Sequence, residues 1–171
     1  MFDFLAAIDR ALSTLCAWTG RAVAWLTLAM VLLTATVVIL RYGFGFGRIY
    51  LQEIITYLHA TVFMLAAAWT LRLDGHVRVD VLYRSLKPRR QAWVDLLGSV
   101  FLLLPTAGLL LWLSYDYAEK AWELQEASRE TDGLPFLYIL KAVIPVASGL
   151  LVLQGVADIL QRAKQLAGAQ E

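Results

Sequence analysis

The stretch AVAWLTLAMVLLTATVVIL, residues 22–40, contains no Asp, Glu, Lys or Arg. A helix needs about 20 mostly apolar residues to cross about 30 Å of hydrocarbon, so this stretch predicts a membrane span. Three further stretches share its composition: residues 54–71, 96–115 and, interrupted by Lys141, 134–156. The sequence therefore predicts an all-α integral membrane protein. We expect one membrane domain over residues 1–171, with spans at about 20–41, 53–72, 95–115 and 137–158.

The composition of the 171-residue chain agrees with a membrane environment. Hydrophobic residues make up 60% of the chain, well above the roughly 45–50% of a soluble domain. The net charge of +1 gives no reason to expect nucleic acid. Cys16 is the only cysteine, which excludes an intrachain disulfide. The first apolar run is long for a signal peptide and has no Ala-x-Ala pattern, so it predicts a retained anchor.

The basic residues predict how the spans are oriented. Most of the 15 Lys and Arg residues lie in the N-terminal segment, the second loop and the C-terminal segment. By the positive-inside rule, both termini and the second loop are expected on the cytoplasmic side of a bacterial inner membrane. The first and third loops then face outward.

Two flanking segments have the pattern of helices that lie along a membrane surface. In the segment Phe2–Trp18, Leu5, Ile8, Leu12 and Leu15 recur at helical spacing, which predicts an N-terminal amphipathic interfacial helix. Val79–Leu86, before Pro88, predicts a short interfacial helix in the cytoplasmic loop. The basic residues around it are expected to bind phospholipid headgroups: Arg84, Lys87, Arg89 and Arg90.

The interiors of the predicted spans contain no Asp or Glu. Carriers that move ions by themselves usually keep such a group within the hydrocarbon, so a self-sufficient transporter is disfavoured. His59 is the one ionisable side chain well inside the second span, which leaves a proton relay or a haem ligand as alternatives to a hydrogen-bonded packing residue. No catalytic, substrate-binding or metal site and no cofactor is predicted.

Four acidic residues in the third loop follow a helical spacing. Glu119, Glu123, Glu126 and Glu130 are separated by 4, 3 and 4 positions and would line one face of a helix. We expect this face on the outer side of the membrane. It is either a periplasmic docking surface for a soluble partner or a solvated extension of the third span.

Three segments, in this order, identify a resemblance: Arg41-Tyr42, Gln52-Glu53 and the run Asp74-Gly75-His76-Val77-Arg78-Val79-Asp80. Together they resemble the small membrane subunit (DctQ-like) of tripartite ATP-independent periplasmic (TRAP) transporters. The resemblance implies a non-enzymatic scaffold beside a large membrane subunit, which moves solute with sodium, and a periplasmic solute-binding protein. The run Gly133-Leu134-Pro135 with Lys141 and Gln154-Gly155 is similar to a branch associated with organic acids.

The resemblance also suggests roles for the matching residues. His76, Arg78 and Asp80 are expected to form a hydrogen-bonded, charge-assisted corner that fixes the cytoplasmic loop or contacts the large subunit. Arg41 and Glu53 are expected to pair across the first loop. The alternatives are a subunit of another membrane complex, such as a haem or quinone enzyme, and a self-sufficient small transporter.

Overall fold

The computed structural model describes residues 2–76 and 83–168, with side chains from residue 14 onward except those of residues 16 and 168. The described residues are helical and contain no strand, as the composition predicts. Their elements are α1 (Phe2–Phe44), α2 (Ile49–Arg72), α4 (Pro88–Gly98), the π-helix η1 (Ser99–Leu103), α5 (Leu104–Glu123) and α6 (Leu137–Gly168).

The four-span prediction is confirmed. Four stretches are long and apolar enough to cross a membrane: Ala17–Phe44, Ile49–Arg72, Pro88–Glu123 and Leu137–Ala167. Within the helices, hydroxyl groups such as those of Thr34 and Thr36 donate to the carbonyls of Met30 and Leu32, four residues earlier. These bonds satisfy polar groups that find no water in hydrocarbon.

Helix α1 differs from the prediction for the N-terminal segment. Its residues form one continuous helix from Phe2 to Phe44, and no break separates an interfacial helix from the first span. At 1.5 Å per residue the 43 residues are about 65 Å long, roughly twice the hydrocarbon thickness. No Pro or Gly precedes Gly20 to interrupt the helix. That its first turns lie along the membrane surface stays a prediction.

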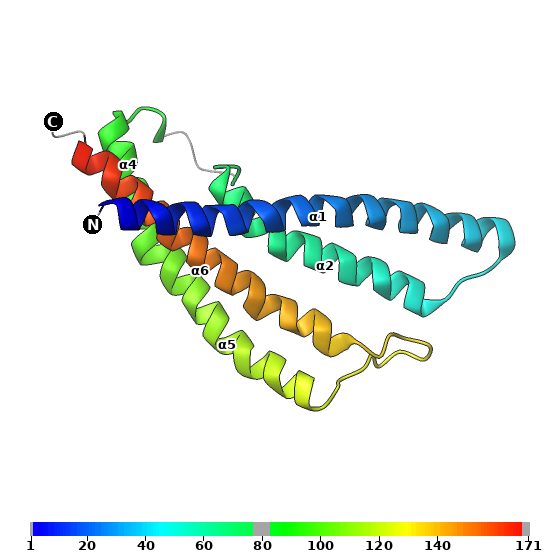
Figure 1. Cartoon of the computed structure of the whole chain (residues 1–171). Coiled ribbons are helices and arrows are strands. Elements are labelled where there is room, and N and C mark those ends of the chain that lie inside the picture. The colour runs from blue at the N-terminus through cyan, green and yellow to red at the C-terminus, as the bar shows by residue number, and fades with distance from the viewer. Residues whose placement is uncertain (1, 77–82, 169–171) are drawn as a thin grey trace.

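The helices run back and forth as two hairpins, and both chain ends lie at one end of the bundle (Figure 1). Helix α6 is central because it contacts α1, α2, α4, η1 and α5. In its most apolar stretch 33% of the residues are buried, against 6–11% in the other three spans. The other helices therefore leave much of their apolar surface to lipid or to partner subunits.

Small side chains form the helix contacts. Buried Ala68, Ala107, Ala147 and Ala157 are among the few residues below 9% exposure. This pattern is typical of membrane helices, whose backbones approach closely where side chains are small. Gly20 of α1 is the tightest such position, since a Cβ there would lie 2.4 Å from the Trp69 ring of α2.

A π-helix interrupts the third span next to Pro105. Pro105 has no N–H group to donate to the preceding turn, and η1 ends two residues before it, at Leu103. The sequence predicts a kink at this proline, and the observed irregularity is this π-helical turn. It starts at Ser99, which belongs to the polar network described below.

Candidate functional site

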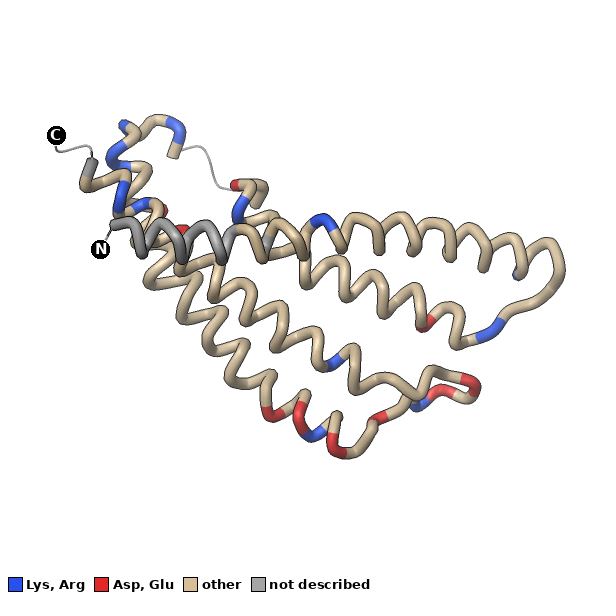
Figure 2. The backbone as a smooth tube through the Cα atoms, in the orientation of Figure 1, with Lys and Arg blue, Asp and Glu red and all other residues tan. Residues whose placement is uncertain are grey.

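Most charged residues of the described bundle gather in two layers, with largely uncharged helix between them (Figure 2). One layer lies at the end where α1 begins and α6 finishes, which we call the terminal end. The other lies at the opposite, distal end, which holds the α1–α2 and α5–α6 loops. No Asp, Glu, Lys or Arg lies between Glu53 and Arg72 in α2, or between Lys141 and Asp158 in α6.

At the distal end, Glu53 of α2 holds the α5–α6 loop. Its Oε2 accepts a hydrogen bond from the backbone N–H of Leu134 at 2.6 Å, and its Oε1 accepts one from the Ser128 hydroxyl. Within the loop, the Ser128 N–H donates to the Leu134 carbonyl at 2.9 Å. One carboxylate thus fixes both sides of a narrow loop to a neighbouring span.

The predicted Arg41–Glu53 pair is not formed. Both oxygens of Glu53 face the α5–α6 loop, and Arg41 is exposed near the end of α1, where no ion pair joins it to a described residue. The α1–α2 loop is instead bonded to the α5–α6 loop through Arg48 and Asp132, at 3.3 Å. This pair is about half exposed, so its contribution to stability is small.

The distal layer also contains an ion pair that is largely shielded from solvent. The Lys141 ammonium of α6 lies 2.5 Å from Oε2 of Glu126 and 4.2 Å from the centre of the Tyr117 ring of α5. The exposed fractions of the Lys141 and Glu126 side chains are 14% and 27%. The cation that interrupts the fourth apolar stretch is therefore neutralised by the loop that precedes it.

The prediction that four glutamates share one helical face is wrong for two of them. Helix α5 ends at Glu123, and Gln125 has the left-handed backbone conformation (φ +47°) that stops a helix. Glu126 consequently turns inward to Lys141, and Glu130 lies in the loop. Glu119 and Glu123, four residues apart on α5, do share an exposed face.

A hollow of about 350 Å³ lies beside these two glutamates, between α5 and α6. Its walls include the aromatic residues Tyr115 and Trp122 and the ring of Pro145. Trp122 also contacts Tyr138 edge to face at 5.0 Å, which ties the end of α5 to the start of α6. Carboxylates beside aromatic rings form a surface suited to basic side chains.

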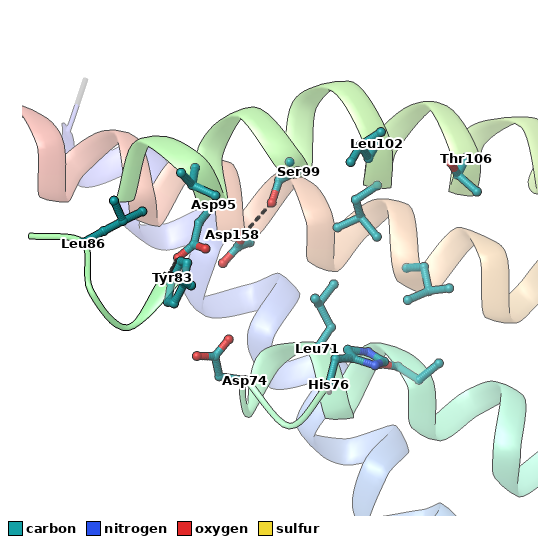
Figure 3. A pocket seen from close by; sticks show the side chains of 15 residues that line it. Leu71, Asp74, His76, Tyr83, Leu86, Asp95, Ser99, Leu102, Thr106 and Asp158 are labelled. Carbon is teal, nitrogen blue, oxygen red and sulfur yellow. Dashed lines mark hydrogen bonds between the residues drawn. The ribbon is translucent and has the colours of Figure 1, made fainter. Parts of the chain in front are cut away.

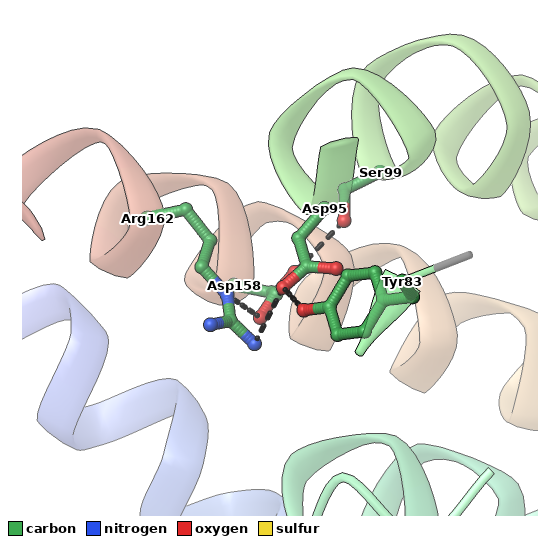
Figure 4. A network of polar contacts seen from close by, with 5 residues as sticks. All are labelled: Tyr83, Asp95, Ser99, Asp158 and Arg162. Carbon is green, nitrogen blue, oxygen red and sulfur yellow. Dashed lines mark hydrogen bonds and ion pairs between the residues drawn. The ribbon is translucent and has the colours of Figure 1, made fainter. Parts of the chain in front are cut away.

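At the terminal end, a polar network joins α4, η1 and α6 (Figure 4). Arg162 lies 3.3 Å from Asp95 and 3.5 Å from Asp158. Asp95 also accepts a hydrogen bond from the Tyr83 hydroxyl, and Asp158 accepts one from the Ser99 hydroxyl, both at 2.8 Å. The exposed fraction of the Asp95 side chain is only 9%. Two carboxylates therefore share one guanidinium at the membrane boundary.

Sequence reasoning missed this network because its two carboxylates lie just outside apolar runs. Asp95 immediately precedes the third run, and Asp158 closely follows the fourth. Consecutive antiparallel spans bring such ends together, and the i, i+4 spacing of Asp158 and Arg162 is typical of a helical ion pair. The positions of the two aspartates at the ends of apolar runs, together with this spacing, are the sequence signal that could have predicted the network.

The predicted corner of His76, Arg78 and Asp80 lies mostly outside the described residues. Residues 77–82, which include Arg78 and Asp80, are not described. His76 is exposed, and its Nε2 lies 3.2 Å from the carbonyl oxygen of Ala67 in α2. The ring therefore lies back against the helix it follows.

The second predicted interfacial segment also falls largely on residues that are not described. Of Val79–Leu86, only residues 83–86 are described, and there the Leu86 N–H donates to the Tyr83 carbonyl in a turn. Helix α4 begins at Pro88. The four residues predicted to meet lipid headgroups are all exposed at the terminal end: Arg84, Lys87, Arg89 and Arg90.

The fold and its two charged layers define a multi-pass helical membrane protein. Among the described side chains, no group of three or more His, Cys, Asp or Glu residues is placed to hold a metal ion. A model of the family described as "Tripartite ATP-independent periplasmic transporters, DctQ component" matches residues 30–165. The chain belongs to this family, and it is a small TRAP transporter component of the inner membrane. A comparison with curated proteins found no match.

Membership confirms the resemblance seen in the sequence. It makes the chain a transporter component rather than a member of an enzyme family. It also implies partnership with a large membrane subunit and a solute-binding protein.

Proposed function

We propose that this chain scaffolds the large membrane subunit and presents a periplasmic surface to the solute-binding protein, without carrying the substrate or ion site itself. The complex would use a sodium gradient to import an organic acid or a similar small solute. The observation that carries the proposal is that the acidic residues of the described bundle lie only toward its two ends (Figure 2). An ion-coupled site needs ligands at membrane depth, which this chain does not supply as carboxylates.

The orientation in this proposal places the terminal end in the cytoplasm. Basic residues gather there, among them the exposed Lys87, Arg89 and Arg90 at the start of α4. Such a cluster favours the side of the membrane with anionic headgroups and follows the positive-inside rule. The distal end then faces the periplasm, where the solute-binding protein works.

The distal loops are suited to docking because they are held in place. Glu53 binds the α5–α6 loop at Ser128 and Leu134, and Glu126 binds Lys141. A surface that is ordered before binding loses less conformational entropy when a partner docks. The acidic side chains exposed at this end include Glu119, Glu123 and Glu130, as well as Asp116 and Asp132.

The docking role is tested by measuring the affinity of the solute-binding protein for the reconstituted membrane complex. We expect the triple substitution E119Q/E123Q/E130Q to weaken binding about tenfold at low salt, and less at high salt, because exposed charges are screened. The matched control is R84Q/R89Q/R90Q at the opposite end, which should leave this affinity unchanged. Unchanged binding in the glutamate variant would reject the docking surface.

The scaffold role is tested by co-purification of the large subunit with this chain. If the run from His76 to Asp80 contacts the large subunit, D80A lowers its recovery, whereas D116N on the exposed face of α5 does not. If D80A recovers as much of the large subunit as the unmodified chain does, this segment does not contribute to the interface. Among the described residues, no observation favours a haem or quinone enzyme or a self-sufficient transporter.

A further inference from the structure

One face of α2 carries exposed polar side chains toward the middle of the membrane. Between residues 50 and 71 of this helix, the exposed side chains are Gln52, Thr56, His59 and Phe63. They are separated by 4, 3 and 4 positions, so they form one row along the helix, which we call the α2 stripe. The helices against which α2 packs, α1 and α6, therefore lie along its other sides.

The imidazole of His59 lies near the middle of the span. His59 follows Ile49, the first residue of α2, by ten positions and precedes Arg72, the last, by thirteen. At 1.5 Å per residue these separations are about 15 Å and 20 Å. Both exceed the reach of a histidine side chain. In a hydrocarbon layer about 30 Å thick, the ring is thus surrounded by apolar solvent unless another protein covers it.

Within this chain the imidazole is left without a partner. No described residue forms a hydrogen bond or an ion pair with the His59 ring. The Thr56 hydroxyl, by contrast, donates to the Gln52 carbonyl of the same helix at 3.1 Å. A neutral imidazole has one N–H donor and one nitrogen acceptor, and polar groups without partners are costly in hydrocarbon. His59 therefore calls for a hydrogen-bonding group from a neighbouring molecule.

The side of α2 that carries the stripe has room for another helix. Continuing the four-residue steps of the stripe, Ala67 and Leu71 line a groove of about 940 Å³, with Leu102 of η1 across from them (Figure 3). A lipid acyl chain would cover the stripe but would offer no hydrogen bond to His59. A membrane helix with a polar side chain does both. Because the stripe contains amide, hydroxyl and imidazole groups and no charged group, a neutral polar side chain complements it.

We propose that the α2 stripe is the contact surface for a transmembrane helix of the large membrane subunit, and that a hydroxyl or amide side chain of this helix forms a hydrogen bond with His59. The inference rests on the proposed scaffold role, to which it adds a contact surface. Family membership implies the large subunit as a partner. Polar side chains that bond across helices stabilise helix association in membranes. Phe63, which is 74% exposed, supplies the apolar part of the contact one turn further along.

The proposal is tested by titrating labelled large subunit into the purified chain in detergent and measuring affinity by energy transfer. We expect H59L to weaken binding about three- to tenfold, the effect of one hydrogen bond between membrane helices. H59Q should recover part of the affinity, because its amide also donates and accepts. The matched control is T34L on the exposed face of α1. It should bind as the unmodified chain does, because the Thr34 hydroxyl already donates to the Met30 carbonyl.

Two further measurements separate the contact from an effect on folding. Because the His59 ring has no described partner within the chain, H59L should leave the thermal unfolding midpoint of the isolated chain unchanged or slightly raised. Independently of that variant, a photoreactive p-benzoylphenylalanine in place of Phe63 should form an adduct with the large subunit when the assembled complex is illuminated.

Three results would overturn the proposal. The first is equal affinity of H59L and the unmodified chain for the large subunit. The second is a lowered unfolding midpoint of isolated H59L, since His59 would then act within this chain. The third is an adduct from position 63 with a second copy of this chain, or with neither protein. If the unmodified chain does not bind the large subunit at all, the scaffold role itself is wrong, and this contact surface is rejected with it.

Discussion

The carboxylate of Glu53 accepts a hydrogen bond from the backbone N–H of Leu134, 81 residues later in the chain, at 2.6 Å. The bond joins α2 to the loop that precedes α6. A carboxylate placed at the start of a span thus orders a loop that belongs to the other helical hairpin. Glu53 is one of the residues on which the sequence resemblance rests, and in the structure it binds the α5–α6 loop.

We expect E53Q to destabilise the chain by about 2 kcal/mol, because an amide can accept one of the two hydrogen bonds but presents an N–H₂ group to the other donor. The measurement is the thermal unfolding midpoint of the purified chain in detergent. Q52E, at the exposed neighbouring position, is the control and should change the midpoint little. A midpoint equal to that of the unmodified chain would show that the loop is held by other contacts.

Lys141 and Glu126 should show an energetic coupling of about 1 kcal/mol in a double-mutant cycle, more than most exposed pairs because both side chains are largely shielded. The variants are K141M, E126Q and their combination, with unfolding in detergent as the readout. K141M alone leaves a carboxylate without its cation, and the double variant should recover part of the loss. Strict additivity would contradict the coupling.

Arg162 should matter more for stability than other cations at the terminal end. In R162M, Asp95 and Asp158 lose their shared guanidinium, and removing one partner of a buried ion pair costs about 3 kcal/mol. The cation of R162K should preserve part of that stability. K164M, two residues further along α6, is the matched control, and an equal loss in K164M and R162M would point to a general effect of charge.

The contact between Gly20 and Trp69 predicts a difference between two glycines of the same helix. G20A should destabilise the α1–α2 hairpin by about 1–3 kcal/mol, because the added Cβ would overlap the indole ring. G43A adds a Cβ that meets nothing within 4 Å and should be neutral or slightly stabilising. Cysteine cross-linking between α1 and α2 offers a second readout. Equal effects of G20A and G43A would indicate that the Trp69 ring does not pack against Gly20.

The spans could be predicted from the sequence because a helix that crosses hydrocarbon must be mostly apolar over about 20 residues. Residues 22–40, 54–71 and 96–115 lie within observed span-length helices, and residues 134–156 lie within the fourth except for their first three positions. The match to residues 30–165 confirms the family. The uncharged middle of the bundle was also evident. These features depend on composition over long windows, which tolerates single exceptions such as Lys141.

The side-chain partners could not be predicted, because they depend on where helices end and how hairpins align. Gln125 adopts a left-handed conformation that stops α5 and sends Glu126 to Lys141, although its sequence gives little sign of it. Glu53 accepts hydrogen bonds from Ser128 and Leu134, which are far away in the sequence, and does not pair with Arg41, which is close in the sequence. Asp95, Asp158 and Arg162 come together only when the third and fourth spans pack side by side.

The central claim is that this chain supports transport without carrying the solute. The most direct measurement is uptake by proteoliposomes of the solute that stabilises the solute-binding protein. We predict uptake when this chain, the large subunit and the loaded binding protein are combined with an inward sodium gradient, and none when this chain is reconstituted alone. Uptake by this chain alone, or undiminished uptake when it is omitted, would contradict the account.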